Sequence, residues 1–317
     1  MDRLDRIYVA GHRGLLGSGL VRRLEAYGYM NLITRSHAEL DLTDHSTVER
    51  FFQTERPEYV FLAAARVGGI GANQKYPADF MYTNLMIETA VLHAAFRTGV
   101  KRLILYGSTC TYPRHCQQPM REVDLLTGSL EPTSEPYALA KIAGMRLCEA
   151  FNRQYGSCFI SVIPPTLYGP GDNFDLESSH VISALIRKVH EAKAEQRDSV
   201  VIWGSGSPRR EFLYSDDAAE GCIHLMNLEE ERLREAVVET GYVINVGAGS
   251  DITISDLAHM IGETVGYGGG LIYDTTRPDG APRKLLDSSR MTGLGWRSET
   301  PLEEGIRRTY EWYRNPR

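Results

Sequence analysis

Three glycines, at positions 11, 14 and 17, constrain the fold of this chain more than any other feature. Gly11 ends an apolar run, residues 6–11, that is typical of a buried strand, and Gly14 and Gly17 follow it. After them comes a helical pattern with Leu20, Val21 and Leu24 on one face. Glycine permits a tight turn and a close backbone approach, so the N-terminus of such a helix can meet a pyrophosphate. The order of strand, glycines and helix therefore predicts a dinucleotide-binding loop. The residues of this loop are Gly11, His12, Arg13, Gly14, Leu15, Leu16 and Gly17.

Apolar runs and helical patterns alternate through the first half of the chain. Strands are expected at 6–11, 31–34, 59–65, 102–108 and 159–164, with helices between them, including one at about 78–98. This alternation predicts an α/β protein with a Rossmann-type, doubly wound parallel sheet. From about residue 165 the loops lengthen and the strands become isolated, which indicates a second, smaller α/β domain. We expect a dinucleotide-binding domain over 1–164, with segments returning from about 215–248, and mainly a substrate domain over 165–317.

The composition is that of an ordinary globular protein, with 42% hydrophobic and 24% charged residues. The formal net charge of −6 disfavours a general surface for nucleic acid or anionic membrane. No apolar run approaches the ~18 residues that span a bilayer, and the first strand begins too early to leave room for a signal peptide. Five cysteines without a CxxC pair indicate reduced thiols, with no disulfide framework and no zinc site. We therefore expect a cytoplasmic protein that holds no metal and binds neither nucleic acid nor membrane.

The end of the second predicted strand bears on the choice of cofactor. An acidic side chain there suits a free ribose 2′-hydroxyl, whereas cations suit a 2′-phosphate. The segment 34–37 contains Arg35 and no acid, and Arg13 in the glycine loop could reach the same phosphate. These residues favour NADP(H) over NAD(H).

Tyr137 and Lys141 are four residues apart in a segment that is expected to be helical, so both side chains lie on one helical face. A lysine ammonium near a phenol stabilises the phenolate and lowers the phenol pKa from about 10. The pair is therefore predicted to exchange a proton near neutral pH. The YxxxK spacing gains weight because it follows a glycine triplet and a strand that ends in Gly-Ser.

These motifs resemble those of the extended short-chain dehydrogenase/reductase family, and the resemblance gives the catalytic roles to Ser108, Tyr137 and Lys141. Within the family, the chain is most similar to NADPH-dependent enzymes that epimerise GDP-4-keto-6-deoxy-D-mannose at C3 and C5 and reduce it at C4, giving GDP-L-fucose. The matching segments run from residue 9 to residue 287 and include VAGHRGLLGS, LAAARVGGIGAN, GSTCTYP, EPYALAKIAGM, LYGPGDNF, SHVISALIRK, WGSGSPRREF and RPDGAPRKLLD.

The resemblance assigns the epimerisation to Cys110 and His180. A ketone at C4 acidifies the C–H bonds at C3 and C5, and a thiol and an imidazole have ordinary pKa values suited to proton exchange near neutrality. The residues alone leave open which group is base and which is acid. The resemblance implies that Cys110 is the base and His180 the acid.

The resemblance also implies a homodimer and two sets of binding residues. Sugar-nucleotide binding is expected at Lys188, Trp203, Arg210 and Lys284. Besides the glycine loop, cofactor contacts are expected at Arg35, Asp41, Leu42, Ala63, Ala64, Ala65, Tyr106, Gly107, Ser108, Thr109, Tyr137, Lys141, Pro164, Pro165, Thr166, Leu167 and His180.

Several positions depart from the pattern of the resembled enzymes, namely Thr109, His37, Thr166, Lys188 and Gly270. They leave room for a related GDP-4-keto-6-deoxy sugar, of a heptose or colitose pathway. A 4,6-dehydratase or 4-epimerase with tightly bound NAD is a second possibility, but the acid that dehydration needs is absent from the GSTC segment. A non-catalytic NADP-sensing protein is a third, although the Tyr/Lys pair that such proteins tend to lose is present.

Overall fold

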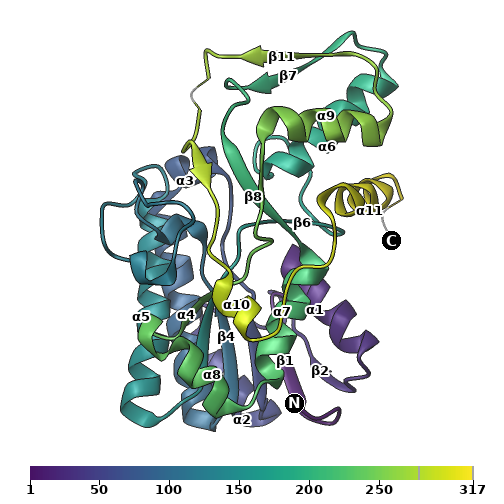
Figure 1. Ribbon diagram of the computed structural model, residues 1–317. Helices are drawn as coiled ribbons and strands as arrows, with labels where there is room; N and C mark the ends of the chain where they lie inside the picture. Colours follow the sequence, from purple (N-terminus) through teal and green to yellow (C-terminus); the bar gives the residue numbers. More distant parts are fainter. Residues whose placement is uncertain (278, 316–317) are drawn as a thin grey trace.

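The computed structural model describes residues 1–277 and 279–315, and its centre is a six-stranded parallel sheet (Figure 1). The strand order is β2-β1-β3-β4-β5-β9. From β1 the chain first adds β2 on one side and then adds β3, β4, β5 and β9 on the other, as in doubly wound sheets. The predicted α/β class and parallel sheet are confirmed. The strands are β1 (Arg6–Ala10), β2 (Asn31–Ile33), β3 (Tyr59–Leu62), β4 (Arg102–Tyr106), β5 (Phe159–Ile163) and β9 (Val243–Asn245).

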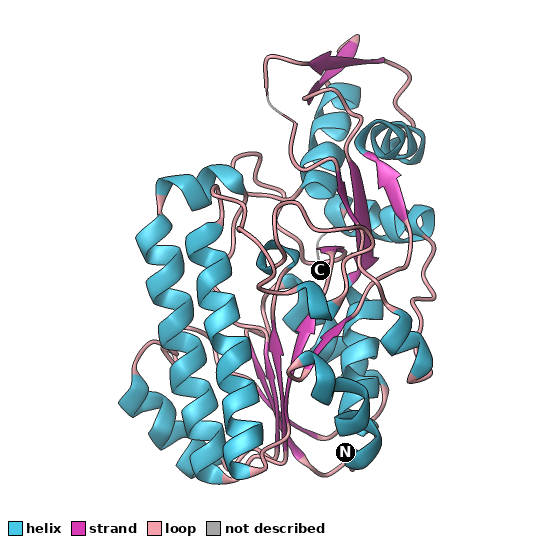
Figure 2. Ribbon diagram, turned by 60° about the vertical axis from the view of Figure 1, so that its left-hand side comes forward, coloured by secondary structure: helices cyan, strands magenta, loops and turns pink. Residues whose placement is uncertain are grey.

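Alternate side chains of these strands pack into two hydrophobic cores, one on each face of the sheet, which is why the strands are apolar without interruption. One core is covered by α2 (His45–Glu55), α4 (Pro77–Thr98) and α5 (Glu135–Tyr155). The other core is covered by α1 (Leu15–Ala26), α7 (Ser215–Asn227), α8 (Glu230–Val237) and α10 (Ser289–Gly293). The long helices α4 and α5 lie side by side along one face (Figure 2).

A second group of strands and helices, called the second layer below, begins where β5 ends; the main sheet with its helices is the first layer. There β6 (Thr166–Tyr168) leaves the main sheet and pairs with β8 (Arg209–Tyr214), which also pairs with β10 (Asp251–Thr253) and β12 (Arg283–Lys284). At the far end, β7 (Ser199–Trp203) pairs in parallel with β11 (Gly270–Asp274). These strands pack against α6 (Val181–Ala194), α9 (Ile254–Val265) and α11 (Leu302–Arg314).

The largest departure from the predicted boundaries lies between β3 and α4. The third strand was expected to reach residue 65, but β3 ends at Leu62, and the side chain of Asn84 on α4 then binds the backbone N–H and C=O of Arg66 at 3.0 Å each. The chain has left the sheet at this point, and these bonds attach it to α4. It then forms the short helix α3 (Ile70–Lys75), which the sequence did not predict, before α4 begins.

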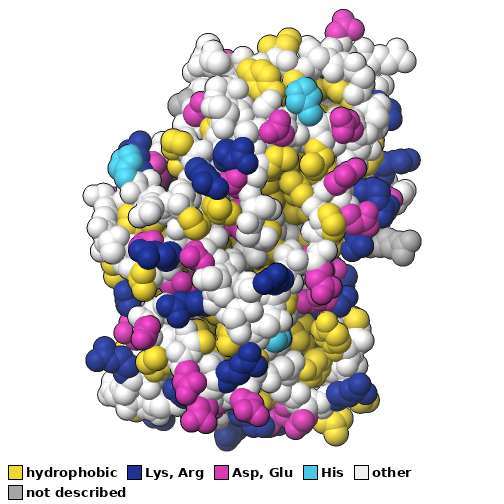
Figure 3. Space-filling view, viewed as in Figure 1, with side chains coloured by type: hydrophobic (Ala, Val, Ile, Leu, Met, Phe, Trp, Pro, Cys, Tyr) yellow, Lys and Arg dark blue, Asp and Glu magenta, His cyan; other side chains and the backbone are white. Residues whose placement is uncertain are grey.

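On the face shown in Figure 3, lysine and arginine side chains are interspersed with acidic ones and form no continuous basic patch. Within the described residues, no helix combines the length and the apolar character that a membrane crossing requires.

Candidate active site

The glycine loop lies at the carboxyl end of β1, and the structure explains its glycines. Gly11 has φ +80°, and a Cβ there would lie 2.6 Å from the backbone nitrogen of Ala64. A Cβ on Gly17 would overlap the carbonyl oxygen of Gly11. Gly14 closes the turn by donating its N–H to that same oxygen at 2.9 Å. Only glycines at 11 and 17 let β1, α1 and the chain after β3 approach this closely.

The start of α1 fits an anionic ligand. No side chain caps this helix, and no acidic residue lies in its first turn. The first N–H groups of an α-helix lack internal partners and carry partial positive charge. The loop is therefore suited to the pyrophosphate of a dinucleotide.

Of the residues predicted to bind a 2′-phosphate, Arg35 lies just after β2 and Arg13 lies in the glycine loop, and the structure adds two acids that the local sequence did not reveal. Arg35 forms an ion pair with Glu55 from the end of α2. Glu39 accepts hydrogen bonds from the backbone and hydroxyl of Ser36, and both Arg35 and Arg13 act on it electrostatically. Both arginines therefore act on Glu39, and a phosphate bound by them would compete with Glu39 and Glu55.

Ser108 and Cys110 lie just beyond the carboxyl end of β4. The hydroxyl of Ser108 accepts the backbone N–H of Cys110 at 3.3 Å, and the carbonyl of Ser108 accepts the N–H of Thr111 at 3.0 Å. These bonds fold residues 109–111 into one 3₁₀ turn rather than continuing the extended strand. The turn keeps the thiol and the hydroxyl close to each other and to α5.

Tyr137 and Lys141 lie in the first two turns of α5. Burial raises the pKa of Tyr137, while Lys141 and the Ser108 hydroxyl lower it. Lys141 acts as predicted, but the expectation of a net lowered phenol pKa is wrong because burial outweighs the lysine. Lys141 itself is buried against Glu88 of α4, with 2.9 Å between Nζ and Oε1.

His180 is the N-cap residue of α6 and its side chain is exposed. Burial raises the pKa of the neighbouring Asp172, whereas its hydrogen bond to Ser183 and the His180 side chain lower it. A Cβ on Gly69, in the loop after β3, would lie 3.9 Å from the carbonyl oxygen of Ser179. The start of α6 therefore faces the main sheet's loops.

Two of the predicted substrate residues form one cluster at the far end. The Nζ atom of Lys188 lies 4.9 Å from the centre of the Trp203 ring, and the Cζ atom of Arg277 lies 5.1 Å from it. Trp203 is 60% exposed, so this cluster of one aromatic ring and two cations is accessible from solvent.

The other two lie on adjacent strands, since Arg210 and Lys284 are register partners in β8 and β12. Asp279 connects this pair to the Trp203 cluster, because it accepts the N–H of Ser205 at 2.9 Å and acts electrostatically on Arg210. Burial lowers the pKa of Arg210. All four predicted substrate residues thus belong to the second layer.

The remaining predicted cofactor residues form three groups. Leu42 and Tyr106 have buried side chains in the two cores, so only their backbones could contact a ligand. Asp41 is exposed and accepts the N–H of Thr43 at 2.9 Å. Thr166 and Leu167 lie in β6, and the others lie just beyond β3, β4 and β5, namely Ala63, Ala64, Ala65, Gly107, Thr109, Pro164 and Pro165.

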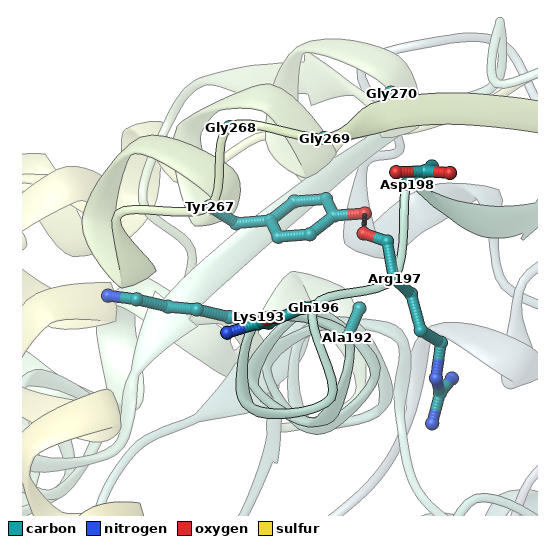
Figure 4. Close-up of a pocket in the computed structure, with 9 residues that line it drawn as sticks. All are labelled: Ala192, Lys193, Gln196, Arg197, Asp198, Tyr267, Gly268, Gly269 and Gly270. Atoms are coloured by element: carbon teal, nitrogen blue, oxygen red, sulfur yellow. Dashed lines mark hydrogen bonds between the residues drawn. The ribbon is translucent and has the colours of Figure 1, made fainter.

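A separate hollow lies between α6, α9 and β11, and Figure 4 shows the nine residues that line it. Its lysine, Lys193, donates to the carbonyl of Val265 at 2.6 Å, and the Tyr267 hydroxyl donates to the carbonyl of Arg197 at 2.9 Å. None of the predicted site residues lines it. In the part of the chain that the structure covers, no three His, Cys, Asp or Glu side chains are grouped to hold a metal ion.

Sequence reasoning missed three acids that the fold takes wholly or partly out of solvent: Glu88 and Glu211, which are buried, and Asp172, which is half-buried. A signal existed for Glu88, which interrupts an apolar helical face in the segment LMIETAVLHAA. Asp172 and Glu211 stand among other polar residues, so their burial could not be read from the sequence.

The fold and this arrangement of residues define an NAD(P)-binding enzyme of the extended short-chain dehydrogenase/reductase class. The chain belongs to the NAD dependent epimerase/dehydratase family, whose sequence model matches residues 7–247.

Individual relatives are similar over nearly the whole chain. The chain is 52% identical to the GDP-L-fucose synthase of Escherichia coli, over 98% of this chain and 96% of the relative. A GDP-6-OMe-4-keto-L-xylo-heptose reductase from C. jejuni superposes with a TM-score of 0.94 at 38% identity, covering 100% of this chain and 99% of the other. A GDP-L-fucose synthetase from Naegleria fowleri bound to NADP superposes with a TM-score of 0.88 at 27% identity, covering 99% and 95%.

Proposed function

We propose that this protein is an NADPH-dependent enzyme that converts GDP-4-keto-6-deoxy-D-mannose to GDP-L-fucose, by inverting C3 and C5 and then reducing C4. One observation carries the proposal. The 3₁₀ turn 109–111, which begins at Ser108 and contains Cys110, packs against α5, which holds Tyr137, so groups for reduction and for epimerisation lie on adjoining elements. The identity of about 50% to proteins named GDP-L-fucose synthase supports the same substrate.

The epimerisation uses this chain's own side chains. Cys110 removes the proton from C3 or C5, which the C4 ketone acidifies, and the carbon is then protonated from the opposite face by His180. The position of His180 at the start of α6, beside the loops of the main sheet, supports a role on the face opposite the β4 turn.

The reduction relies on Tyr137 as the acid. NADPH, when bound, supplies the hydrogen and the electron pair that reduce C4. Tyr137 donates its proton to the C4 oxygen, and the raised pKa keeps that proton in place at neutral pH. Ser108 donates a hydrogen bond to the same oxygen, and the Lys141 ammonium stabilises the developing phenolate.

The binding roles follow the two layers. The glycine loop, with Arg13 and Arg35, would hold the NADP pyrophosphate and 2′-phosphate, while Trp203 and Lys188 would bind the GDP moiety. The first layer, 1–164 with the returning segments, would be the cofactor domain, and 165–317 mainly the substrate domain. We further propose a cytoplasmic homodimer formed through α4 and α5, which expose Met81, Tyr82 and Leu139.

The test mixes the protein with NADPH and GDP-4-keto-6-deoxy-D-mannose in deuterium oxide. NADPH oxidation with deuterium at C3 and C5 of the product is expected. In Cys110→Ser, deuterium exchange should fall far more than NADPH binding, whereas Cys116→Ser is the matched control. Cys116 lies in the same segment, bonds Asp124 and has its pKa raised by burial to about 11. Unchanged exchange in Cys110→Ser would remove that thiol from the mechanism.

A second candidate is C4 reduction of a related GDP-4-keto-6-deoxy sugar without full epimerisation. It is favoured by the TM-score of 0.94 to the heptose reductase and by a point charge, Lys188, at the substrate cluster. NADPH oxidation without deuterium incorporation would select this candidate. A failure to oxidise NADPH would contradict both candidates.

A further inference from the structure

Glu88 is a buried acid that the proposed reaction does not use. It lies on α4, and its carboxylate pairs with the Lys141 ammonium of α5 across 2.9 Å. The side chain of Glu88 is 1% exposed and that of Lys141 is 2% exposed. An ion pair this dry is costly to build, because both charges lose their hydration.

The surroundings of Glu88 are shaped to receive its carboxylate. Gly144 lies on α5 one turn after Lys141, and a Cβ there would overlap Oε2 of Glu88 and lie 3.0 Å from Leu105 of β4. Apart from the ion pair with Lys141, the Glu88 oxygens have no hydrogen-bond partner among the described residues. Among the described residues, the Lys141 ammonium is therefore the group that the Glu88 carboxylate binds.

The charges of three groups are coupled. The pKa of Glu88 is raised by burial and lowered by Lys141, and burial outweighs the lysine. The pKa of Lys141 is lowered by burial, but Glu88 and Tyr137 raise it above its ordinary value. The pKa of Tyr137 is raised by burial and by Glu88 and Cys110, and lowered by Lys141 and the Ser108 hydroxyl. One further titratable group, Cys148, feels the Glu88 charge from the next turns of α5.

We propose that Glu88 is a positioning residue: its carboxylate fixes the Lys141 ammonium and thereby keeps the proton on Tyr137 until the C4 oxygen takes it. This inference rests on the proposed function, in which Tyr137 is the acid of the C4 reduction.

The direction of the effect follows from the sum of the charges. A neutral phenol, an ammonium and a carboxylate sum to zero, whereas glutamine at position 88 leaves a net positive charge. A buried, coupled cluster with a net positive charge releases its first proton more readily. Because the Glu88 charge raises the pKa of Tyr137, its removal should make the phenol the group that loses this proton, and its loss stops the reduction.

The first experiment titrates the full chain without cofactor, following tyrosinate absorbance in the wild type and in Glu88→Gln, each measured against its Tyr137→Phe counterpart. The second follows the alkaline limb of the NADPH-dependent reduction. In Glu88→Gln, the first proton loss and the alkaline limb should both move down by about one pH unit or more. Glu88→Asp, which keeps the charge, should return the limb toward the wild-type position.

Glu122→Gln is the matched control, because Glu122 is also buried and paired with a cation, Arg290, at 3.4 Å. It should leave both curves in place. An unmoved or upward-shifted curve in Glu88→Gln overturns the proposal. If Glu88→Gln does not fold, Lys141→Met replaces it, and a protonated carboxyl band must appear in its infrared spectrum near neutral pH. The absence of that band also overturns the proposal.

The failures of the two proposals are distinguishable. A wild-type enzyme that oxidises no NADPH contradicts the proposed function, whereas the cofactor-free titration still measures whether Glu88 controls the Tyr137 proton.

Discussion

Replacing Glu211 with glutamine should change how the stability of the protein depends on pH. Glu211 lies in β8 and is 2% exposed. Its Oε1 accepts the N–H of Gly249 at 2.8 Å, and its Oε2 accepts the N–H of Leu286 at 2.8 Å. One carboxyl group therefore ties β8 to the segment after β9 and to the segment that follows Lys284.

The magnitude follows from the pKa. Burial raises the pKa of Glu211 from 4.5 to about 7, although the backbone N–H groups oppose the shift. Between these two values the folded protein holds a proton that the unfolded chain releases. The stabilisation is therefore complete below about pH 4.5 and is lost as the pH rises through about 7. A shift of roughly 2.5 units at about 1.36 kcal/mol each corresponds to about 3 kcal/mol.

The assay is urea unfolding of the wild type and Glu211→Gln at a series of pH values, with the m-value checked for constancy. Glutamine does not titrate, and its bonds differ from those of the carboxyl group by an amount that does not depend on pH. The pH-dependent part of the difference in unfolding free energy therefore reports the titration of Glu211 alone. The variant should gain about 3 kcal/mol relative to the wild type between about pH 4.5 and about pH 8. The exposed Glu231→Gln is the control. Parallel stability curves for the wild type and Glu211→Gln would refute the reasoning.

Three further outcomes are expected at the site. Gly17→Ala should reduce NADPH affinity by about tenfold or more in a binding titration, with an unchanged circular dichroism spectrum, because the added Cβ overlaps Gly11; normal affinity would contradict this. Arg35→Ala should reduce the preference for NADPH over NADH by about tenfold, since a hydrogen bond to a charged group contributes about 1.5–3 kcal/mol, and an unchanged ratio of kcat/KM would exclude the role. Trp203→Ala should raise KM for the GDP-sugar by about tenfold with little change in kcat, because base stacking contributes about 1–3 kcal/mol, and an unchanged KM would place the base elsewhere.

Local sequence patterns were enough to predict much of this protein. Gly11, Gly14 and Gly17 predicted the loop between β1 and α1, since tight turns and close backbone approach restrict which residues fit. The apolar strands predicted the parallel sheet, because strands covered on both faces need no polar side chains. The spacing of Tyr137 and Lys141 placed both side chains on one face of α5, as helical geometry requires.

The tertiary structure decided what depends on segments distant in sequence. Lys141 is 53 residues beyond Glu88 in the numbering, and only the packing of α5 on α4 buries the two together and raises rather than lowers the Tyr137 pKa. The pairing of β8 with β12 likewise brings Arg210 beside Lys284. Burial and charge pairing depend on which distant groups become neighbours, and this information is absent from any local pattern of residues.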